Sequence, residues 1–204
     1  MKTICIGRNY AKHAAELGNE LPKDPVLFLK PETAIIPKKM PFFIPDHSED
    51  VHYELELVVR INRLGKHIQP QFAHKYYSEV ALGIDFTARD VQAKLKEKGL
   101  PWEKAKAFDG SAFVSPFKPV DQLKNDINHL QLRLDKNGET VQDGNTSNML
   151  FKVDQLIAEV SKYFTLKIGD LLFTGTPEGV GPVSENDTLT GYLEGEELFR
   201  LKVK

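Results

Sequence analysis

Hydrophobic and polar residues alternate most regularly in the segment VHYELELVVRI, residues 51–61. Every second residue from Val51 to Ile61 is apolar, and the residues between them include Glu54 and Glu56. A period of two is typical of a β-strand with one buried face. Glu54 and Glu56 therefore project from the opposite face of this strand, roughly 6–7 Å apart.

Shorter apolar runs bounded by glycine, proline or polar residues predict further strands at residues 3–7, 25–31, 80–85, 171–175 and 198–203. Leucines alternate with polar residues from Leu130 to Leu134, and the following Asn137-Gly138 pair predicts a β-hairpin over residues 130–142. Strands therefore dominate the predicted structure.

Helices are predicted at residues 10–17, 87–99 and 149–164, and at the start of residues 72–80. Gly18 and Asn19 would end the first helix, and Thr87 would cap the second. We find no internal repeat and no linker. The pattern indicates a β-rich α+β fold with a few helices, in a single domain over residues 1–204.

Composition excludes some classes of function. Of the 204 residues, 41% are hydrophobic and 27% are charged, and the net charge is −2. Nucleic acids and anionic membranes attract concentrated Lys and Arg, so we expect neither as a partner. Cys5 is the only cysteine and suits a reducing compartment. No apolar stretch approaches the ~18 residues that span a bilayer, and CIGRNYAKH lacks the long apolar run of a signal peptide. We expect a soluble, cytoplasmic protein.

Asp85 adds a third carboxylate to Glu54 and Glu56. It ends the apolar run VALGID, where a buried and unpaired charge would be very costly. A solvated strand face is the alternative explanation for an E-x-E motif alone. Ligation by carboxylate oxygens favours Mg²⁺, Mn²⁺ or Ca²⁺ over zinc or copper. We interpret the three residues as a site for one such ion.

The order of motifs along the chain resembles that of the fumarylacetoacetate hydrolase family. The motifs are GRNYAKHAAE, PVLFLKP, HYELELVV, GIDFTARDVQ, GLPWEKAKAFDG, GNTSNMLF and DLLFTGTPEGVGP. They cover essentially the whole chain. They are most similar to the short members related to acylpyruvases, oxaloacetate decarboxylases and 2-hydroxyhepta-2,4-diene-1,7-dioate isomerases.

This resemblance implies a mixed β-sandwich or β-roll of the family's C-terminal type, with a few helices, that forms a homodimer. It also implies a Mg²⁺ or Mn²⁺ ion, for which Ca²⁺ can substitute, held by Glu54, Glu56 and Asp85. These are the same three residues that the strand pattern indicates.

The resemblance further implies three catalytic residues. His13 and Glu16 lie three residues apart in a predicted helix, so they share a face, and family members use such a pair as a general base on a mobile lid. A solvated helix face is the alternative. Lys106 would stabilise a developing oxyanion, although a lysine in such a stretch is more often a solvated surface residue.

Substrate-binding residues are implied in the same way: Arg89, Gln92, Gly175, Thr176 and Lys30. A guanidinium such as that of Arg89 suits a carboxylate, but Arg89 can instead pair with Asp90. The loop at residues 176–182 lacks the lysine and spacing of a phosphate-binding P-loop. It can be a tight turn and still shape the pocket through Thr176.

The function that these residues favour is hydrolysis of a C–C bond in acylpyruvates, which are diketo acids, through a pyruvate enolate stabilised by the metal ion. The same site also suits oxaloacetate decarboxylation or tautomerisation, and hydroxymuconate isomerisation, because all three pass through an enolate. A non-catalytic β-sandwich that binds metal for stability is the alternative of a different class. The expected partner is a small α-keto acid.

Overall fold

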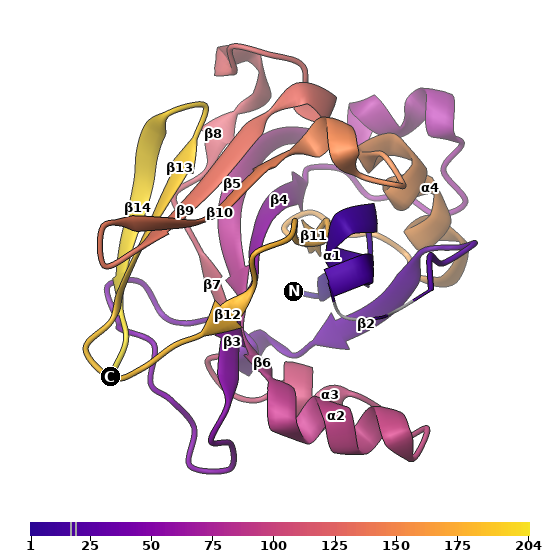
Figure 1. Cartoon of the computed structure of the whole chain (residues 1–204). Helices are drawn as coiled ribbons and strands as arrows, with labels where there is room; N and C mark the ends of the chain where they lie inside the picture. Colours follow the sequence, from indigo (N-terminus) through magenta and orange to yellow (C-terminus); the bar gives the residue numbers. More distant parts are fainter. Residues whose placement is uncertain (17, 19) are drawn as a thin grey trace.

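The computed structural model describes residues 1–16, 18 and 20–204 of the chain. In this part of the chain, three sheets surround a common core, and the helices pack on the outside of the sheets (Figure 1). The structure is α+β and strand-rich, as the sequence predicts. The single-domain organisation over residues 1–204 stays a prediction. Leu17 and Asn19, at the predicted end of the first helix, lie outside the described residues.

The main sheet carries the strands that position the site. Its strand order is β2-β1-β11-β4-β5-β7, and β8 also pairs with β5. The strands are β1 (Thr3–Gly7), β2 (Val26–Lys30), β4 (Leu55–Ile61), β5 (Tyr77–Asp85), β7 (Ala112–Val114), β8 (Lys118–Pro119) and β11 (Leu171–Phe173). β1 and β11 are parallel, and the other pairs are antiparallel.

The second sheet has the order β10-β9-β13-β14. Its strands are β9 (Gln131–Lys136), β10 (Glu139–Asn145), β13 (Thr188–Leu193) and β14 (Glu196–Lys202). The predicted hairpin is confirmed, because Asn137 and Gly138 turn β9 into β10 with φ values of 55° and 89°. Both residues tolerate this left-handed conformation, which a tight hairpin turn requires.

A third, small sheet has the order β12-β3-β6, formed by β3 (Val51–Tyr53), β6 (Thr87–Ala88) and β12 (Gly181–Pro182). The prediction of one strand over residues 51–61 is therefore wrong in one respect. The chain leaves the small sheet after Tyr53 and enters the main sheet at Leu55, so the strand is interrupted at Glu54. The polar face of this segment is also buried, since the main sheet is covered on both sides.

The helices lie outside this framework of sheets. They are α1 (Ala11–Glu16), α2 (Arg89–Glu97), α3 (Glu103–Lys106) and α4 (Val153–Tyr163), with 3₁₀ helices η1 (Glu32–Ala34), η2 (Pro70–Tyr76), η3 (Val120–Gln122), η4 (Ile127–His129) and η5 (Thr146–Asn148). The prediction that Thr87 caps a helix is wrong. Thr87 belongs to β6, and its hydroxyl donates to Glu54 Oε1 over 3.0 Å. In Figure 1, α2 and α3 lie together at the end of the molecule below β3.

The core fills the space between the sheets and α4. Leu57, Leu82, Leu132 and Leu156 are fully buried in it, contributed by β4, β5, β9 and α4. A smaller apolar cluster contains Cys5 of β1, which is fully buried. Burial is the main reason that the pKa of the Cys5 thiol is raised, and the negative charge of Asp85 adds to this effect. No helix in the described part of the chain is long and apolar enough to cross a membrane.

Candidate functional site

Three carboxylates converge where β4 begins and β5 ends. Antiparallel pairing sets Leu55 opposite Ile84, and the Asp85 amide donates to the Glu54 carbonyl over 2.9 Å. This register brings Asp85 beside the two glutamates. One oxygen from each of Glu54, Glu56 and Asp85 lies within 4.8 Å of the others. All three side chains are buried, with exposures of 5%, 1% and 1%.

Cations from three other segments contact two of these carboxylates. Lys106 Nζ lies 2.8 Å from both Glu54 Oε2 and Asp85 Oδ2. Arg89 Nη2 lies 2.6 Å from Glu54 Oε1, and Lys30 Nζ lies 2.8 Å from Asp85 Oδ1. The alternative that Lys106 is a solvated surface residue does not hold, because its side chain is buried between carboxylates.

Lys30 is also buried, and its ammonium is directed at protein groups. Besides its contact with Asp85, Nζ donates to the Ser111 carbonyl and hydroxyl over 3.1 and 3.0 Å, and to the Lys106 carbonyl. These contacts explain why a lysine at the end of a strand lies in the interior. They place Lys30 behind Asp85, and its substrate-binding role stays a prediction.

The surrounding charges affect the carboxylates unequally. Burial raises the pKa of Glu54, but Lys106 and Arg89 outweigh this effect and hold that pKa well below its usual value. Burial likewise lowers the pKa of Lys106, but Asp85 and Glu54 outweigh it, so this pKa lies above its usual value. For Glu56, burial and then the charges of Asp85 and Glu54 raise the pKa well above the usual value. Glu56 is therefore the carboxylate that most lacks a nearby positive charge.

The site fits a hard divalent cation. Glu56 forms no ion pair with any described residue, and it accepts only the Gly175 amide, over 2.6 Å. Asp85 Oδ1 is buried, yet it accepts no hydrogen bond of normal geometry from the described residues. Three carboxylate oxygens with unused lone pairs are the donor set that Mg²⁺ and Mn²⁺ prefer.

The predicted base pair lies on α1. His13 Nδ1 is 3.2 Å from Glu16 Oε2, and His13 is buried with 5% exposure. After burial, Lys106 and Arg89, His13 is the next group that affects the pKa of Glu54, so the imidazole lies near the carboxylates. A solvated helix face therefore does not describe His13.

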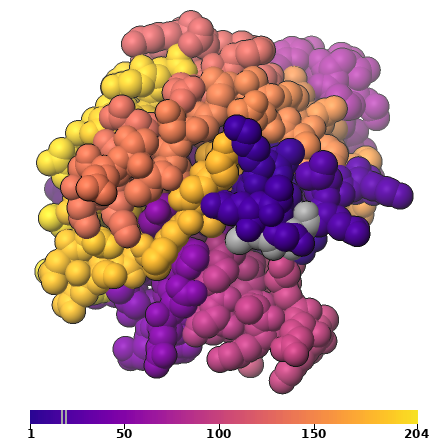
Figure 2. Space-filling view, viewed as in Figure 1, coloured from indigo at the N-terminus to yellow at the C-terminus, as the bar shows by residue number. Residues whose placement is uncertain are grey.

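α1 is held against the glycine-rich loop. The Gly179 amide donates to Glu16, 3.2 and 3.3 Å from its two oxygens, and Lys12 Nζ lies 3.3 Å from Glu178 Oε1. Figure 2 shows the N-terminal segment (indigo) packed against this late segment (yellow-orange). These contacts fix α1 against the loop that follows β11.

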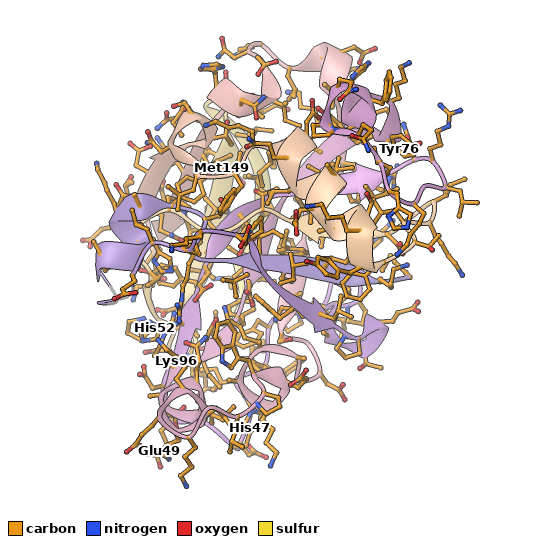
Figure 3. The ribbon with its side chains drawn as sticks, turned by 90° about the vertical axis from the view of Figure 1, so that its right-hand side faces the viewer. His47, Glu49, His52, Tyr76, Lys96 and Met149 are labelled. Carbon is orange, nitrogen blue, oxygen red and sulfur yellow. The ribbon has the colours of Figure 1, made fainter. Side chains whose placement is uncertain are left out.

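Arg89 and Gln92 lie at the start of α2, and Arg89 Nη1 donates to Gln92 Oε1 over 2.8 Å. Arg89 pairs with Glu54 rather than with Asp90, which accepts the Ser48 hydroxyl over 2.5 Å. Arg89 Nε is buried and has no partner among the described residues. In Figure 3, His52 lies at the same end of the molecule as Lys96 of α2, and burial, then Arg89, lower the pKa of His52.

Gly175 and Thr176 follow β11. Gly175 has a φ of 97°, and a Cβ there would lie 2.7 Å from Asn9 Cβ, so glycine is required. Thr176 is buried, and its hydroxyl oxygen accepts a hydrogen bond from Gln142 over 2.9 Å. Gln142 and Asn9 also lie at the site, and neither was predicted from the sequence. Asn9 Nδ2 donates to the Thr174 carbonyl over 2.8 Å and links the GRNY motif to the loop.

The chain is similar to proteins of one known family. The model of the family "Fumarylacetoacetate (FAA) hydrolase C-terminal" matches residues 2–203. The chain is 45% identical to the oxaloacetate tautomerase YcgM of Escherichia coli K12 over 197 residues, which cover 97% of this chain and 90% of the relative. It is 42% identical to the mitochondrial oxaloacetate decarboxylase of Dictyostelium discoideum, over 95% of this chain and 89% of the relative.

A solved structure shares the fold. It is a fumarylpyruvate hydrolase from Pseudomonas aeruginosa in complex with Mn²⁺ and pyruvate, with a TM-score of 0.93 and 36% identity. The match covers 100% of this chain and 89% of that one. These relatives are named for different reactions, so they do not by themselves assign a substrate.

Proposed function

The chain belongs to the fumarylacetoacetate hydrolase family, and we propose that it is a divalent-metal-dependent enzyme that interconverts the keto and enol forms of oxaloacetate. The observation that carries this proposal is the buried cluster of Glu54, Glu56 and Asp85 with Lys106 beside it. An enolate is the species that such a site is suited to stabilise. The 45% identity to an oxaloacetate tautomerase supports this substrate.

Glu54, Glu56 and Asp85 would hold Mg²⁺ or Mn²⁺. When bound, the ion supplies Lewis-acid polarisation of the substrate's 2-oxo group. Around it, Arg89 and Gln92 would bind a substrate carboxylate, which suits the planar guanidinium of Arg89. Lys106 would place its positive charge near the oxygen that becomes negative in the enolate.

His13 is the proposed proton carrier. Because Glu16 contacts Nδ1, the imidazole proton is held on Nδ1, which leaves Nε2 as the base. The C3 proton of the keto form would move to Nε2, and the resulting imidazolium would return a proton to the C2 oxygen, which gives the enol and the neutral imidazole. The reverse sequence returns the keto form. In the forward direction the C3–H bond breaks and the O–H bond forms, while the double bond moves from C2–O to C2–C3.

A second candidate is hydrolysis of acylpyruvates, favoured by the same His13–Glu16 pair. In that reaction, His13 Nε2 would take a proton from water as the water oxygen attacks the distal carbonyl. Cleavage of the C–C bond then yields an acid and the enolate of pyruvate, which is protonated at carbon. Oxaloacetate decarboxylation is a third reaction of the same site, and it needs no attacking water.

One panel of assays tests these proposals. Metal-stripped enzyme would be supplied with Mg²⁺ or Mn²⁺, and enol absorbance, pyruvate formation and acylpyruvate loss would be followed. His13→Ala should lower tautomerisation, and any hydrolysis, by about 10²–10⁴-fold, the usual contribution of a general base. Decarboxylation should fall less. The control is His129→Ala, because the His129 side chain is 70% exposed.

Two outcomes would contradict the proposal. A wild-type enzyme that turns over none of these substrates with either ion would favour the non-catalytic, metal-stabilised alternative. Full activity of His13→Ala would remove His13 from the mechanism.

We also propose that the chain forms a homodimer, and an apolar face supports this. Met40 and Phe43 are 48% and 57% exposed, and both line a cavity of about 540 Å³ with Ile35 and Pro41. Light scattering would measure the mass in solution, and Phe43→Asp should convert a dimer that uses this face into monomer. A cytoplasmic location stays a prediction, to be tested by localising a tagged chain.

A further inference from the structure

Gln142 joins two parts of the site that lie far apart in the sequence. The side chain is 1% exposed. Its Oε1 accepts the Leu55 amide over 2.9 Å, and its Nε2 donates to Thr176 Oγ1 over 2.9 Å and to the Pro177 carbonyl over 3.0 Å. One amide group therefore contacts the backbone between the two glutamates and the threonine of the loop.

The local fold directs this side chain into the site. The β9–β10 register shifts between Thr140 and Gln142, and such a bulge re-aims the following side chain. β10 also lies very close to the loop. A Cβ on Gly144 would be 2.5 Å from Pro177 Cβ, and one on Gly179 would be 2.2 Å from the Val141 carbonyl oxygen.

The partners fix the orientation of the amide. The Leu55 amide can only donate and the Pro177 carbonyl can only accept, so Oε1 must face Leu55 and Nε2 must face Pro177. Nε2 therefore donates to Thr176 Oγ1, and the threonine hydroxyl is an acceptor in that bond. In the described part of the chain, Thr176 Oγ1 donates no hydrogen bond, so its proton remains for a ligand.

Gln142 Oε1 accepts a backbone amide at the point where the strand is interrupted. The Leu55 amide lies at the point where the chain passes from the small sheet to the main sheet, and Gln142 supplies its acceptor. Since Leu55 lies between Glu54 and Glu56, this bond holds the backbone that carries both carboxylates.

We propose that Gln142 is a positioning residue with two effects. It presents the Thr176 hydroxyl as a donor to a carboxylate of the substrate, and it fixes the backbone between Glu54 and Glu56. The inference rests on the proposed function. Because the Thr176 hydroxyl is left as a donor, the ligand group that it binds must be a hydrogen-bond acceptor, such as the carboxylate of a 2-oxo acid.

Two variants separate the effects. Gln142→Glu keeps an acceptor for the Leu55 amide but removes the donor to Thr176, whose hydroxyl then donates to the introduced carboxylate. Gln142→Met keeps the length of the side chain but removes both bonds. Gln131→Glu on β9 is the control, because Gln131 is exposed.

The test measures Mn²⁺ binding, then oxalate binding to the Mn²⁺-loaded protein by calorimetry, and finally oxaloacetate kinetics. With Gln142→Glu, the oxalate Kd and the KM should rise about 10–100-fold, as for loss of one hydrogen bond to a charged group. The kcat should change little, because this contact is made equally in the ground and transition states. With Gln142→Met, the Mn²⁺ Kd should rise as well.

A purely structural role would instead lower the fraction of active protein, and so kcat, at an unchanged KM. The Thr176→Val variant removes the hydroxyl through which Gln142 is proposed to act on the substrate. There, Gln142→Glu should cause no further rise in the oxalate Kd. Wild-type oxalate affinity in a folded Gln142→Glu variant, or fully additive effects with Thr176→Val, would overturn the inference. A wild-type protein that binds neither Mn²⁺ nor oxalate would overturn the proposed function itself.

Discussion

Replacing Lys106 by methionine should destabilise the metal-free protein, and the structure indicates by how much. Lys106 Nζ contacts both Glu54 and Asp85 at 2.8 Å, and its side chain is buried. Methionine fills a similar volume, so the change removes charge without leaving a large cavity. The two carboxylates then share less positive charge while they remain buried.

The remaining contacts set the size of the effect. Removing one partner of a buried ion pair costs about 3–5 kcal/mol. Arg89 still contacts Glu54 at 2.6 Å and Lys30 still contacts Asp85 at 2.8 Å, so we expect the lower end, about 3 kcal/mol. For a chain of 204 residues, this corresponds to a melting temperature lower by about 6–12 °C.

The loss should depend on pH. Of the charges that hold the pKa of Glu54 below its usual value, Lys106 has the largest effect. A lowered pKa stabilises the folded state at pH values above the usual pKa of glutamate, and this stability is lost as the pH falls toward the lowered pKa. The difference between wild type and Lys106→Met should therefore be greatest near neutral pH and shrink in acid.

Calorimetric melting in EDTA, followed by a Mn²⁺ titration, checks the prediction. Because the ammonium no longer competes for Glu54 and Asp85, Mn²⁺ should raise the melting temperature of Lys106→Met more than that of the wild type. Lys162→Met is the control, since Lys162 forms an exposed pair with Glu159. A melting temperature in EDTA within about 2 °C of wild type would refute the reasoning.

Three further predictions concern the metal, pH and the loop. In EDTA-stripped wild type, Mg²⁺ or Mn²⁺ should raise the melting temperature by linkage, and Glu56→Ala should abolish the rise; no response in wild type would contradict the site. Asp170→Asn should cost about 1.5–3 kcal/mol in urea unfolding, because Asp170 accepts two backbone amides at 2.8 Å. Burial raises the Asp170 pKa, but its hydrogen bonds outweigh this and lower it, so the cost should fade in acid below about pH 4; an equal cost at both pH values would disagree. Gly179→Ala should cost more than Gly195→Ala in the same assay, because both have positive φ but only Gly179 would also collide with the Val141 carbonyl; equal costs would contradict the close packing of the loop.

The sequence predicts the convergence of the carboxylates better than it predicts their surroundings. Alternation places Glu54 and Glu56 on one face, and the end of an apolar run places Asp85 at a strand terminus, so local patterns suffice. The interruption at Glu54 leaves no mark in the pattern, because it depends on which strands pair on either side. Residues 53 and 55 therefore look alike in sequence although they lie in different sheets.

Contacts between distant segments could not be predicted from the pattern. Gln142 lies 87 residues from Leu55 and 34 from Thr176, and nothing in the segment ETVQDGN distinguishes a buried amide from an exposed one. Lys30 has the pattern of an exposed residue at a strand end, yet Asp85 and Ser111 hold it inside. Thr87 has the composition of a helix cap, but the pairing of β6 with β3 turns its hydroxyl toward Glu54.

Chemical modification of Cys5 can report the opening of the main sheet. This thiol is the only one in the chain and is fully buried, and it lies on β1, which pairs with β2 on one side and with β11 on the other. Thiol reagents attack the thiolate, which burial and the nearby Asp85 disfavour here, so modification requires strands of the main sheet to separate first. The rate of modification then measures the free energy of that opening, as hydrogen exchange does for amides. Because each chain has one thiol, the fraction of protein whose mass has risen by one reagent gives the fraction of molecules that have opened.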